Sequence, residues 1–338
     1  MPLRGDWGIM ASDILIQATA LNRFYGDYHA VKDFNLTLHK GEVLGLLGPN
    51  GAGKSSTMQM LTGNISPSSG EIKINDIDLL NDPMKAKSLI GYLPEQPPIY
   101  RDMTAVEFLK YCAVLHNVSK EKVKGVIDIA LDRCGLQSVS NKLIANLSKG
   151  FQQRVGIAQA ILHQPDIVIL DEPTVGLDPI QITQIRELIQ ELGRDHSVIL
   201  STHILPEVQA VCDRVQIINQ GKTVFSDTLG ELTEKQSSTS LIIGFDEAIE
   251  EESLAALVGI DEVIELESSD KQHRYQLHSS TSTKKSTIDA GAVFQLAVEK
   301  GWKLKELTPK VYSLEQIFMD LIHSDSATSQ VNIEKEVA

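Results

Sequence analysis

Residues 48–56 read Gly48-Pro49-Asn50-Gly51-Ala52-Gly53-Lys54-Ser55-Ser56. An apolar run with the composition of a buried strand precedes them at residues 43–47, and a stretch of helical composition follows at residues 57–61. A glycine-rich turn that matched the pattern by chance would not need both of these neighbours. A strand, G-x-x-x-x-G-K-S and a helix are together the context of a phosphate-binding P-loop. The stretch therefore predicts a site for the phosphates of a nucleoside triphosphate.

The residue types in this loop suit an anion. Glycines let the backbone curl so that several N–H groups point at one phosphate, beside the positive end of a helix. Lys54 adds a mobile positive charge for the β- and γ-phosphates, and the Ser55 hydroxyl can ligate Mg²⁺.

Two carboxylates follow a second apolar run, residues 167–170, which reads as a central parallel strand. Asp171 and Glu172 thus come at the carboxyl end of a strand, where ligands of open α/β sheets bind. One of them can hold Mg²⁺ and the other can polarise an attacking water; the alternative is a solvated strand end without a role. A third buried strand, residues 197–200, leads to His203, which points toward the same crevice or is structural.

Two weaker candidates lie elsewhere. Ser148, Lys149 and Gly150 open a helix, which makes them a second potential anion site, although serine is common at helix N-termini. Tyr25 lies just upstream of the P-loop and is either a platform for stacking a base or a core tyrosine.

The length, composition and net charge of the chain limit the class of protein to which it can belong. The chain of 338 residues is long enough for two domains, and its 42% apolar residues support packed cores. Its net charge of −14 argues against a nucleic-acid partner. The three cysteines have no metal-ligand spacing and read as buried free thiols of a reducing compartment. No window is apolar enough for a membrane span, and the first residues lack the apolar region of a signal peptide.

The fold class that follows is α/β with a second, smaller domain. Residues 1–12 are an unassigned extension with Met10 as an alternative start, and the nucleotide-binding domain covers residues 13–234. Its first strand is expected at residues 14–20, with a turn from residue 21. A helical block at about residues 97–160 interrupts the α/β pattern; its first helix opens with a capping box at Thr104 and Glu107.

The remaining chain has a different pattern. Residues 235–323 suggest β-α-β-β-α-β, a ferredoxin-like order, with helices near residues 251–258 and 286–300. A final amphipathic helix opens with a capping box at Ser313 and Gln316, and residues 324–338 read as a disordered tail. Because no constellation here suggests chemistry, this domain is interpreted as a regulatory or dimer-stabilising module, or as a passive appendage.

The order of these motifs resembles that of the ATP-binding subunit of ABC transporters, over about residues 13–232. The matching sequences are the Walker A motif GPNGAGKSS, the Walker B motif IVILDEP, the D-loop GLDP and the switch STH. The resemblance implies a P-loop NTPase core with a helical subdomain, and ATP and Mg²⁺ as cofactors. It also implies the residue roles: Lys54, Ser55 and the rest of Walker A bind phosphate, with Ser55 and Asp171 on Mg²⁺, Glu172 as general base and His203 as γ-phosphate sensor. Tyr25 falls where the family has its adenine-stacking aromatic residue, and Asp178 is the aspartate of the D-loop.

Two departures from the family pattern stand out. The family signature is LSGGQ, whereas this chain has LSKGF, which keeps Ser148 and Gly150 for γ-phosphate contacts. After IGYLP the family has a glutamine, but here Glu95 occupies that position and Gln96 follows, so either is a candidate for Mg²⁺ or the water. Both departures resemble exporter-type ATPases related to drug-efflux and gliding-motility systems.

The resemblance further implies partners. Such subunits form head-to-tail dimers in which each ATP lies between one P-loop and the signature helix of the other subunit. The chain has one of each, so an identical second copy is expected, together with a separate membrane permease and a location at the inner face of the cell membrane. The alternatives are a soluble ABC-type ATPase that serves ribosomes, DNA repair or cluster assembly, and a nucleotide-sensing partner that does not hydrolyse ATP.

Overall fold

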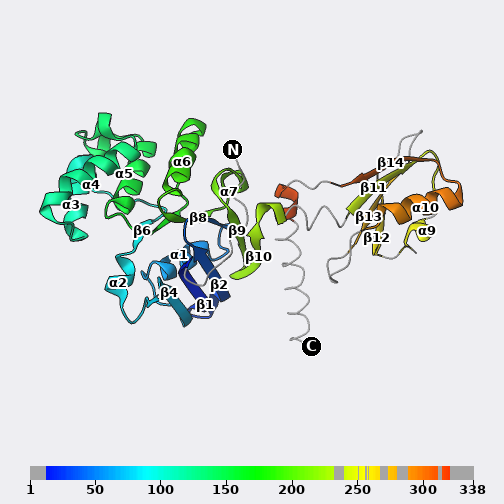
Figure 1. Cartoon of the computed structure of the whole chain (residues 1–338), viewed down its shortest axis with the longest axis horizontal. Helices are drawn as coiled ribbons and strands as arrows, with labels where there is room; N and C mark the ends of the chain where they lie inside the picture. Colours follow the sequence, from blue (N-terminus) through cyan, green and yellow to red (C-terminus); the bar gives the residue numbers. More distant parts are fainter. Residues whose placement is uncertain are drawn as a thin grey trace. The chain divides into compact units, whose positions relative to one another are not determined.

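The computed structural model describes residues 13–231, 240–249, 251–255, 257, 259–266, 273–279, 288–310 and 314–319. The chain divides into two compact units, Met1–Asp227 and Thr228–Ala338 (Figure 1). This boundary precedes the one expected after residue 234, and residues 232–239 lie outside the described ranges. The expected N-terminal extension, the capping residue Ser313 and the expected disordered tail also lie outside them, whereas residues 314–319 are helical.

A six-stranded sheet forms the centre of the larger unit, in the order β10-β9-β3-β8-β7-β6. The strands are β3 (Val43–Leu47), β6 (Ile90–Leu93), β7 (Ile167–Asp171), β8 (Ser197–Thr202), β9 (Arg214–Asn219) and β10 (Lys222–Thr228). Neighbouring strands from β9 to β6 pair in parallel, and β3, β7 and β8 are buried along their whole length. Because parallel strands end at the same edge, the segments that follow β3, β7 and β8 come together there.

A second, antiparallel sheet has the order β2-β1-β4-β5. It contains β1 (Ile14–Tyr25), β2 (Tyr28–His39), β4 (Ser69–Ile74) and β5 (Ile77–Asp78). The expectation that the first strand ends at Ala20 is wrong, since β1 continues to Tyr25. Register shifts between Ala18 and Phe24 and a left-handed Ala20 (φ 50°) let the strand stay paired past the polar stretch. Tyr25 and Tyr28 consequently face each other across the turn.

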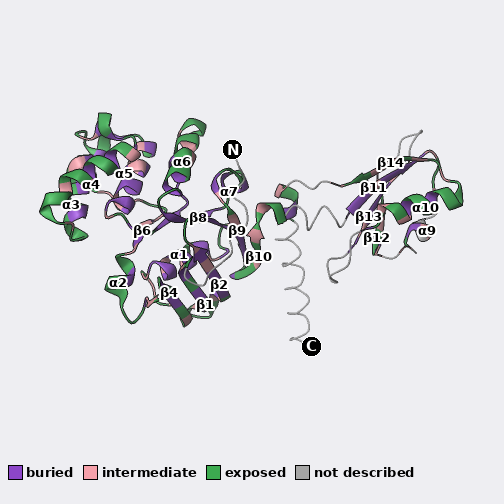
Figure 2. Ribbon diagram, viewed as in Figure 1, coloured by how far each residue is buried: buried purple, intermediate pink, exposed green. Residues whose placement is uncertain are grey.

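Seven α-helices are described in the larger unit: α1 (Lys54–Leu61), α2 (Pro83–Lys87), α3 (Ala105–Leu115), α4 (Lys120–Arg133), α5 (Lys149–Ile161), α6 (Pro179–Leu192) and α7 (Leu205–Val211). The helical block consists of α3, α4 and α5, which share one hydrophobic core (Figure 2). The capping box opens α3 as expected: Thr104 Oγ1 accepts from Glu107 N, and a Glu107 carboxylate oxygen accepts from Thr104 N at 2.9 Å. In contrast, α1 begins at Lys54, earlier than the expected residue 57, so the P-loop runs directly into the helix.

The three cysteines are free thiols, but only Cys112 and Cys134 are buried, whereas Cys212 is partly buried after α7. Burial raises the pKa of Cys112 to about 11 and that of Cys134 to about 12. Both thiols therefore stay protonated near neutral pH and serve packing rather than reactivity.

The smaller unit has the elements β11 (Ser240–Phe245), α9 (Glu251–Ala255), β12 (Glu262–Glu265), β13 (His273–His278), α10 (Ala290–Lys300) and β14 (Leu304–Pro309). Its sheet is antiparallel in the order β12-β13-β11-β14, so the described elements follow a β-α-β-β-α-β order. The second helix begins later than expected because Asp289 caps it, accepting a hydrogen bond from Gly291 N at 2.8 Å. In the described ranges of both units, no helix has the length and apolar composition needed to cross a membrane.

The packing of α5 on β6 is tested by two glycine substitutions. A Cβ on Gly91 in β6 would lie 2.0 Å from the Ala160 carbonyl oxygen of α5, whereas a Cβ on Gly125 in α4 would meet nothing within 4 Å. Gly91→Ala is therefore expected to lower the free energy of unfolding by about 1–3 kcal/mol. Gly125→Ala should raise it by about 1 kcal/mol, because alanine favours the helix. Urea unfolding measures both, and a Gly91→Ala variant as stable as the parent chain would contradict this packing.

Candidate nucleotide-binding site

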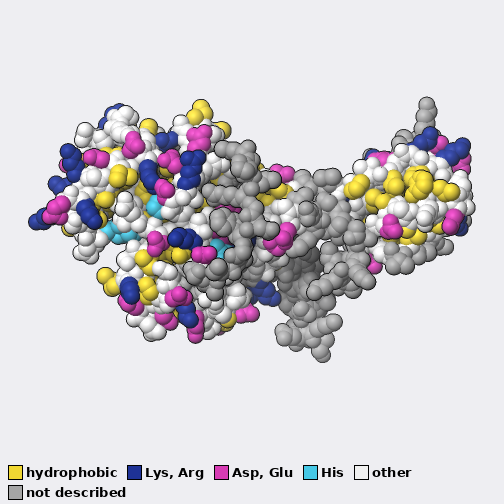
Figure 3. Space-filling model, in the orientation of Figure 1, with side chains coloured by type: hydrophobic (Ala, Val, Ile, Leu, Met, Phe, Trp, Pro, Cys, Tyr) yellow, Lys and Arg dark blue, Asp and Glu magenta, His cyan; other side chains and the backbone are white. Residues whose placement is uncertain are grey.

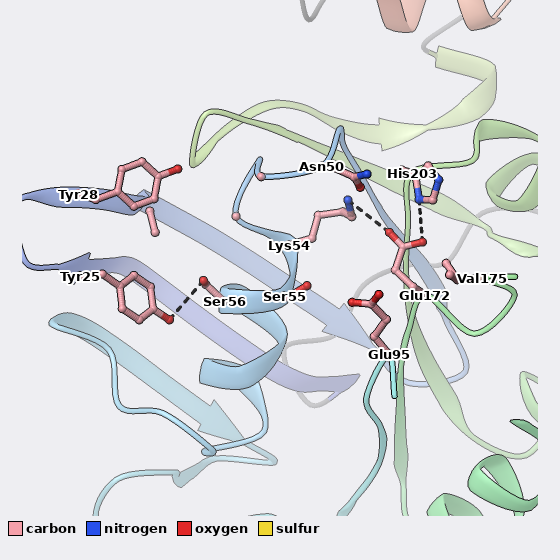
Figure 4. Close-up of a pocket in the computed structure, with 13 residues that line it drawn as sticks. Tyr25, Tyr28, Asn50, Lys54, Ser55, Ser56, Glu95, Glu172, Val175 and His203 are labelled. Atoms are coloured by element: carbon pink, nitrogen blue, oxygen red, sulfur yellow. Dashed lines mark hydrogen bonds and ion pairs between the residues drawn. The ribbon is translucent and has the colours of Figure 1, made fainter. Parts of the chain in front are cut away.

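A cavity of about 470 Å³ lies where β3, β7 and β8 end (Figure 4). It is lined by Tyr25, Tyr28, Ala30, Asn50, Gly51, Gly53, Lys54, Ser55, Ser56, Glu95, Glu172, Val175 and His203. The P-loop after β3, the Walker B segment after β7 and the switch after β8 all contribute to it, as the sequence led us to expect.

The P-loop requires glycine at two of its positions. Gly53 has φ 108° and is the residue before α1, and a Cβ there would lie 2.7 Å from the Ala30 carbonyl oxygen. A Cβ on Gly48 would lie 2.3 Å from the Ile218 carbonyl oxygen. Any larger residue would force the loop away from β2 and β9. The chain can hence curl tightly enough to present its N–H groups, at the positive end of α1, to one anion.

Lys54 is the buried cation of the site, with 5% of its surface exposed. Its Nζ donates to the carbonyl oxygens of Gly48 at 2.8 Å and Pro49 at 3.2 Å, and lies 3.4 Å from Glu172 Oε1. A buried ammonium needs such partners, and a phosphate oxygen offers a stronger one than a neutral carbonyl.

Glu172 is held on both sides (Figure 4). Its Oε1 faces Lys54, and its Oε2 lies 2.8 Å from His203 Nδ1. The residue has a left-handed backbone (φ 49°), which is uncommon for a non-glycine residue, and its N–H donates to the Ser201 carbonyl oxygen at 2.9 Å. Such strain persists where the surrounding structure fixes it, often at functional sites. The left-handed backbone turns the Glu172 carboxylate into the cavity, where this carboxylate can accept a proton from a water.

Asp171 fits a Mg²⁺ ligand. It is buried, and its Oδ1 has no hydrogen-bond partner among the described residues. Burial raises the pKa of Asp171, the Ser201 hydroxyl opposes the shift, and the negative charges of Glu172 and Glu95 add to it. A buried anion with an unpaired oxygen is costly unless a cation neutralises it. The Ser55 hydroxyl and the Glu95 carboxylate, which point into the same part of the cavity, complete a set of oxygen donors typical for Mg²⁺ (Figure 4).

The other expected site residues lie at the rim of the cavity, in its lining or outside it. Tyr25 lies at the cavity rim, 43% exposed, with its hydroxyl 3.4 Å from Ser56 Oγ. Of the two Q-loop candidates, Glu95 lines the cavity and Gln96 does not. The lining also leaves out seven other expected residues: Gly48, Pro49, Ala52, Ser148, Gly150, Asp171 and Asp178. Ser148 caps α5 and Asp178 caps α6.

The sequence analysis missed four residues of this region, one of which is Ala30 in β2, a residue of the cavity lining. Tyr28 and Val175 line the cavity, and only the pairing of Tyr28 with Tyr25 across the turn brings it there. Glu207 of α7 is buried, with 1% of its surface exposed. Its carboxylate accepts hydrogen bonds from Thr174, which follows Walker B, and from Thr202 at 2.7 Å, which precedes His203. Glu207 thus ties together the two segments that carry Glu172 and His203.

Comparisons with known proteins agree with this geometry. The family model described as "ABC transporter" matches residues 31–175. The uncharacterized ABC transporter ATP-binding protein YxlF of Bacillus subtilis is 34% identical to the chain over 92% of the chain and 100% of YxlF. The chain belongs to the ABC transporter ATP-binding family.

This ABC protein has further relatives of known structure or assigned role. The bacitracin transport ATP-binding protein BcrA of Bacillus licheniformis is 33% identical over 91% of the chain and 97% of BcrA. The structure of CbiO1 from Clostridium perfringens, described as part of the ABC transporter complex CbiONQ, superposes with a TM-score of 0.60 at 30% identity, over 65% of this chain and 90% of CbiO1. This chain is accordingly an ATPase of the ABC family that binds ATP.

Loss of the carboxylate at residue 172 should separate binding from turnover. Glu172→Gln keeps the side-chain shape but removes the proton acceptor, so ATP turnover should fall by about 10²-fold or more. Lys54→Ala should instead abolish ATP binding, because the cavity loses its buried cation. Steady-state hydrolysis and titration calorimetry measure the two effects. Unchanged turnover in Glu172→Gln, or unchanged ATP affinity in Lys54→Ala, would contradict the roles assigned here.

Replacing Asp171 should stabilise the free protein but impair its binding of Mg²⁺-ATP. Because burial raises the pKa of this carboxyl, its charged form is unfavourable in the folded protein at neutral pH, and the amide of Asp171→Asn avoids that cost. We expect Asp171→Asn to raise the thermal midpoint without Mg²⁺ and ATP, and to abolish the additional stabilisation by Mg²⁺-ATP. Differential scanning calorimetry checks both expectations, and a lower midpoint in the free variant would refute the first.

Glu207 should act through position rather than contact with ATP. Glu207→Ala leaves the hydroxyls of Thr174 and Thr202 unpaired in a buried place, so both stability and turnover should fall. Glu207→Gln keeps one acceptor and should retain more of each. If Glu207→Ala hydrolysed ATP as the parent chain does, the proposed tie between Walker B and the switch would be unnecessary.

Proposed function

We propose that this ABC protein is the ATP-hydrolysing subunit that powers a separate membrane permease, of exporter type, from the cytoplasmic face of the membrane. The names of two relatives support this: BcrA is named for bacitracin transport, and CbiO1 is part of a transporter complex. The LSKGF signature and Glu95, both shared with exporter-type ATPases by resemblance, favour export over import.

The proposal rests on one observation: the expected site residues fall into a group that lines the cavity and a group, the signature residues, that does not. The cavity contains the phosphate loop, the general base and the switch histidine, but Ser148 and Gly150 of the signature do not line it. Ser148 Oγ instead accepts a hydrogen bond from Phe151 N at the start of α5, where the N-terminus of the helix favours an anion. A second copy, arranged head to tail, would bring its signature helix over this cavity. ATP would then be the contact that closes the dimer.

In this closed site the residues have separate tasks. The P-loop N–H groups and Lys54 bind the phosphates, and Glu172 accepts the proton of the attacking water. His203, hydrogen-bonded to Glu172, holds that carboxylate in place and senses the γ-phosphate. Mg²⁺ would be held by Ser55, Asp171 and Glu95, and when bound it neutralises phosphate charge. Tyr25 at the rim would stack on the adenine.

Closure and hydrolysis follow one cycle. Binding of ATP to both copies buries the nucleotides between them, and hydrolysis removes the γ-phosphate contact that holds the signature helix. The dimer then reopens, and a permease attached to both copies alternates between two states. The soluble alternative has no support in the comparisons, because the relatives named here are transport proteins or ABC transporter subunits.

The trans role of the signature predicts the behaviour of Ser148→Arg. This variant should bind ATP as the parent chain does, because Ser148 is remote from its own cavity, but a bulky cation in place of the hydroxyl should prevent closure. In the Glu172→Gln background, light scattering should detect an ATP-dependent dimer that Ser148→Arg abolishes. Dimerisation of the double variant with ATP would refute the role of Ser148 across the interface.

The permease itself can be identified by copurification. Glu172→Gln, tagged and expressed in the native cell, should be trapped with ATP and recovered from membranes together with a polytopic membrane protein. Recovery from the cytosol with ribosomes, DNA or an assembly complex would overturn the transport proposal.

A further inference from the structure

The ring of Tyr25 lies outside the hydrophobic cores of the larger unit and is held by two polar neighbours instead. Tyr25 ends β1, is 43% exposed and belongs to neither core. Its hydroxyl lies 3.4 Å from Ser56 Oγ in α1 (Figure 4). The guanidinium of Arg23 lies over the ring, with Cζ 4.6 Å from the ring centroid. This exposed aromatic ring is thus fixed at its edge and on one face.

The Arg23 side chain is anchored by a contact of its own. Its Nη1 donates to the Ser66 carbonyl oxygen at 3.0 Å, in the segment between α1 and β4. Its Nε is buried and has no hydrogen-bond partner among the described residues. A buried donor without a partner costs free energy, so hydrogen bonding alone does not account for this position. Attraction between the guanidinium and the ring face does, because a cation over an aromatic face is favourable.

The aromatic residue between these two is engaged elsewhere. Phe24 stacks on His29 of β2, with ring centroids 3.9 Å apart and ring planes at 16°. Its backbone N–H donates to Ser68 Oγ at 3.1 Å. Both contacts fix this end of the β1–β2 hairpin. Phe24 is therefore not the support of the Tyr25 ring, and Arg23 takes that place.

The two faces of the Tyr25 ring have different surroundings. Tyr25 lines the cavity, whereas Arg23 does not. Since the guanidinium lies over one face and outside the lining, the opposite face of the ring borders the cavity. A nucleobase offers a flat π-face that stacks on such a ring.

The positive charge of Arg23 is local to this ring. On the face of the larger unit drawn in Figure 3, Lys and Arg side chains are interspersed with Asp and Glu side chains. The net charge of the chain is −14, so its overall field repels an anionic nucleotide. Favourable contacts with a nucleotide must therefore come from individual groups at the site.

We propose that Arg23 is a positioning residue of the ATP site, which holds the Tyr25 ring in place for the adenine base in a guanidinium–phenol–base stack. The inference rests on the proposed function, in which Tyr25 stacks on the adenine. Because the guanidinium fixes the ring before ATP arrives, less side-chain entropy is lost on binding. Its charge also draws π-electron density toward its own side of the ring. The opposite face then attracts the electron-rich face of a base more strongly.

Titration calorimetry of the full chain with Mg²⁺-ATP and with Mg²⁺-tripolyphosphate tests the proposal, because tripolyphosphate carries the phosphates without the base. Arg23→Met keeps an unbranched side chain but removes the charge, so the affinity for ATP should fall about three- to tenfold. The affinity for tripolyphosphate should stay unchanged. Arg23→Lys retains a cation and should regain part of the loss. Arg101→Met is the matched control, because Arg101 is exposed and does not line the cavity.

A double-variant cycle shows whether Arg23 acts through Tyr25. Tyr25→Leu should weaken ATP binding by about tenfold or more, as expected for the loss of base stacking. In the Tyr25→Leu background, Arg23→Met should have no further effect, because the ring that it positions is gone. An equal effect of Arg23→Met in both backgrounds, or an equal loss of tripolyphosphate binding, would overturn the proposal.

Failure of this proposal and failure of the proposed function give different results. If Arg23→Met bound ATP like the parent chain while Tyr25→Leu bound it weakly, the role of Arg23 alone would be refuted. Parent-like ATP binding by Tyr25→Leu would refute the stacking role of Tyr25 itself, and the role of Arg23 with it.

Steady-state hydrolysis adds a readout that a loss of folded protein would not reproduce. Arg23→Met should raise KM for ATP and leave kcat unchanged, because the base takes no part in the reaction at the γ-phosphate. A lower kcat at unchanged KM would contradict a role in binding the base.

Discussion

The ion pair and hydrogen bond that hold Glu172 between Lys54 and His203 depend on the parallel order of three buried strands. Each partner comes from the segment after a different strand: Lys54 after β3, Glu172 after β7 and His203 after β8. Because these strands are paired in parallel and in register, their ends meet at one edge, although more than a hundred residues separate Lys54 from Glu172. The charged groups of the site are thus fixed by the apolar packing of the sheet behind them.

In our proposal, one copy of the chain provides only one side of the reaction site. Lys54 and Glu172 line the cavity at the sheet edge. The buried Asp171, whose Oδ1 has no hydrogen-bond partner among the described residues, directly precedes Glu172. In the same proposal, the N-terminus of α5, which Ser148 caps, contacts the nucleotide of the other copy, since Ser148 does not line the cavity of its own copy. ATP carries enough negative charge to join two such surfaces, which links binding to association and hydrolysis to release.

The local patterns in the sequence were sufficient to predict which segments meet at the cavity. The P-loop, the strand before Asp171 and the strand before His203 each have a distinctive composition, and their parallel pairing follows from the α/β order. Features that depend on tertiary contacts were not predictable. Glu207 sits on an ordinary amphipathic helix, and only the folded chain brings its carboxylate to Thr174 and Thr202. The extension of β1 to Tyr25, which brings Tyr28 to the cavity rim, depends on bulges that have no clear sequence signal. That Glu95 lines the cavity and Gln96 does not was likewise left open by the sequence.

The central claim is that each ATP is hydrolysed between the P-loop of one copy and the signature of the other. Its most direct test is a mixing experiment with two inactive variants. Lys54→Ala lacks a working P-loop but has an intact signature, and Ser148→Arg has the converse defect. Each variant alone should be inactive, whereas a mixture should form heterodimers with one complete site and regain ATP turnover well above the sum of the two. A mixture as inactive as its components would contradict the shared site, and turnover by Ser148→Arg alone would show that one copy suffices.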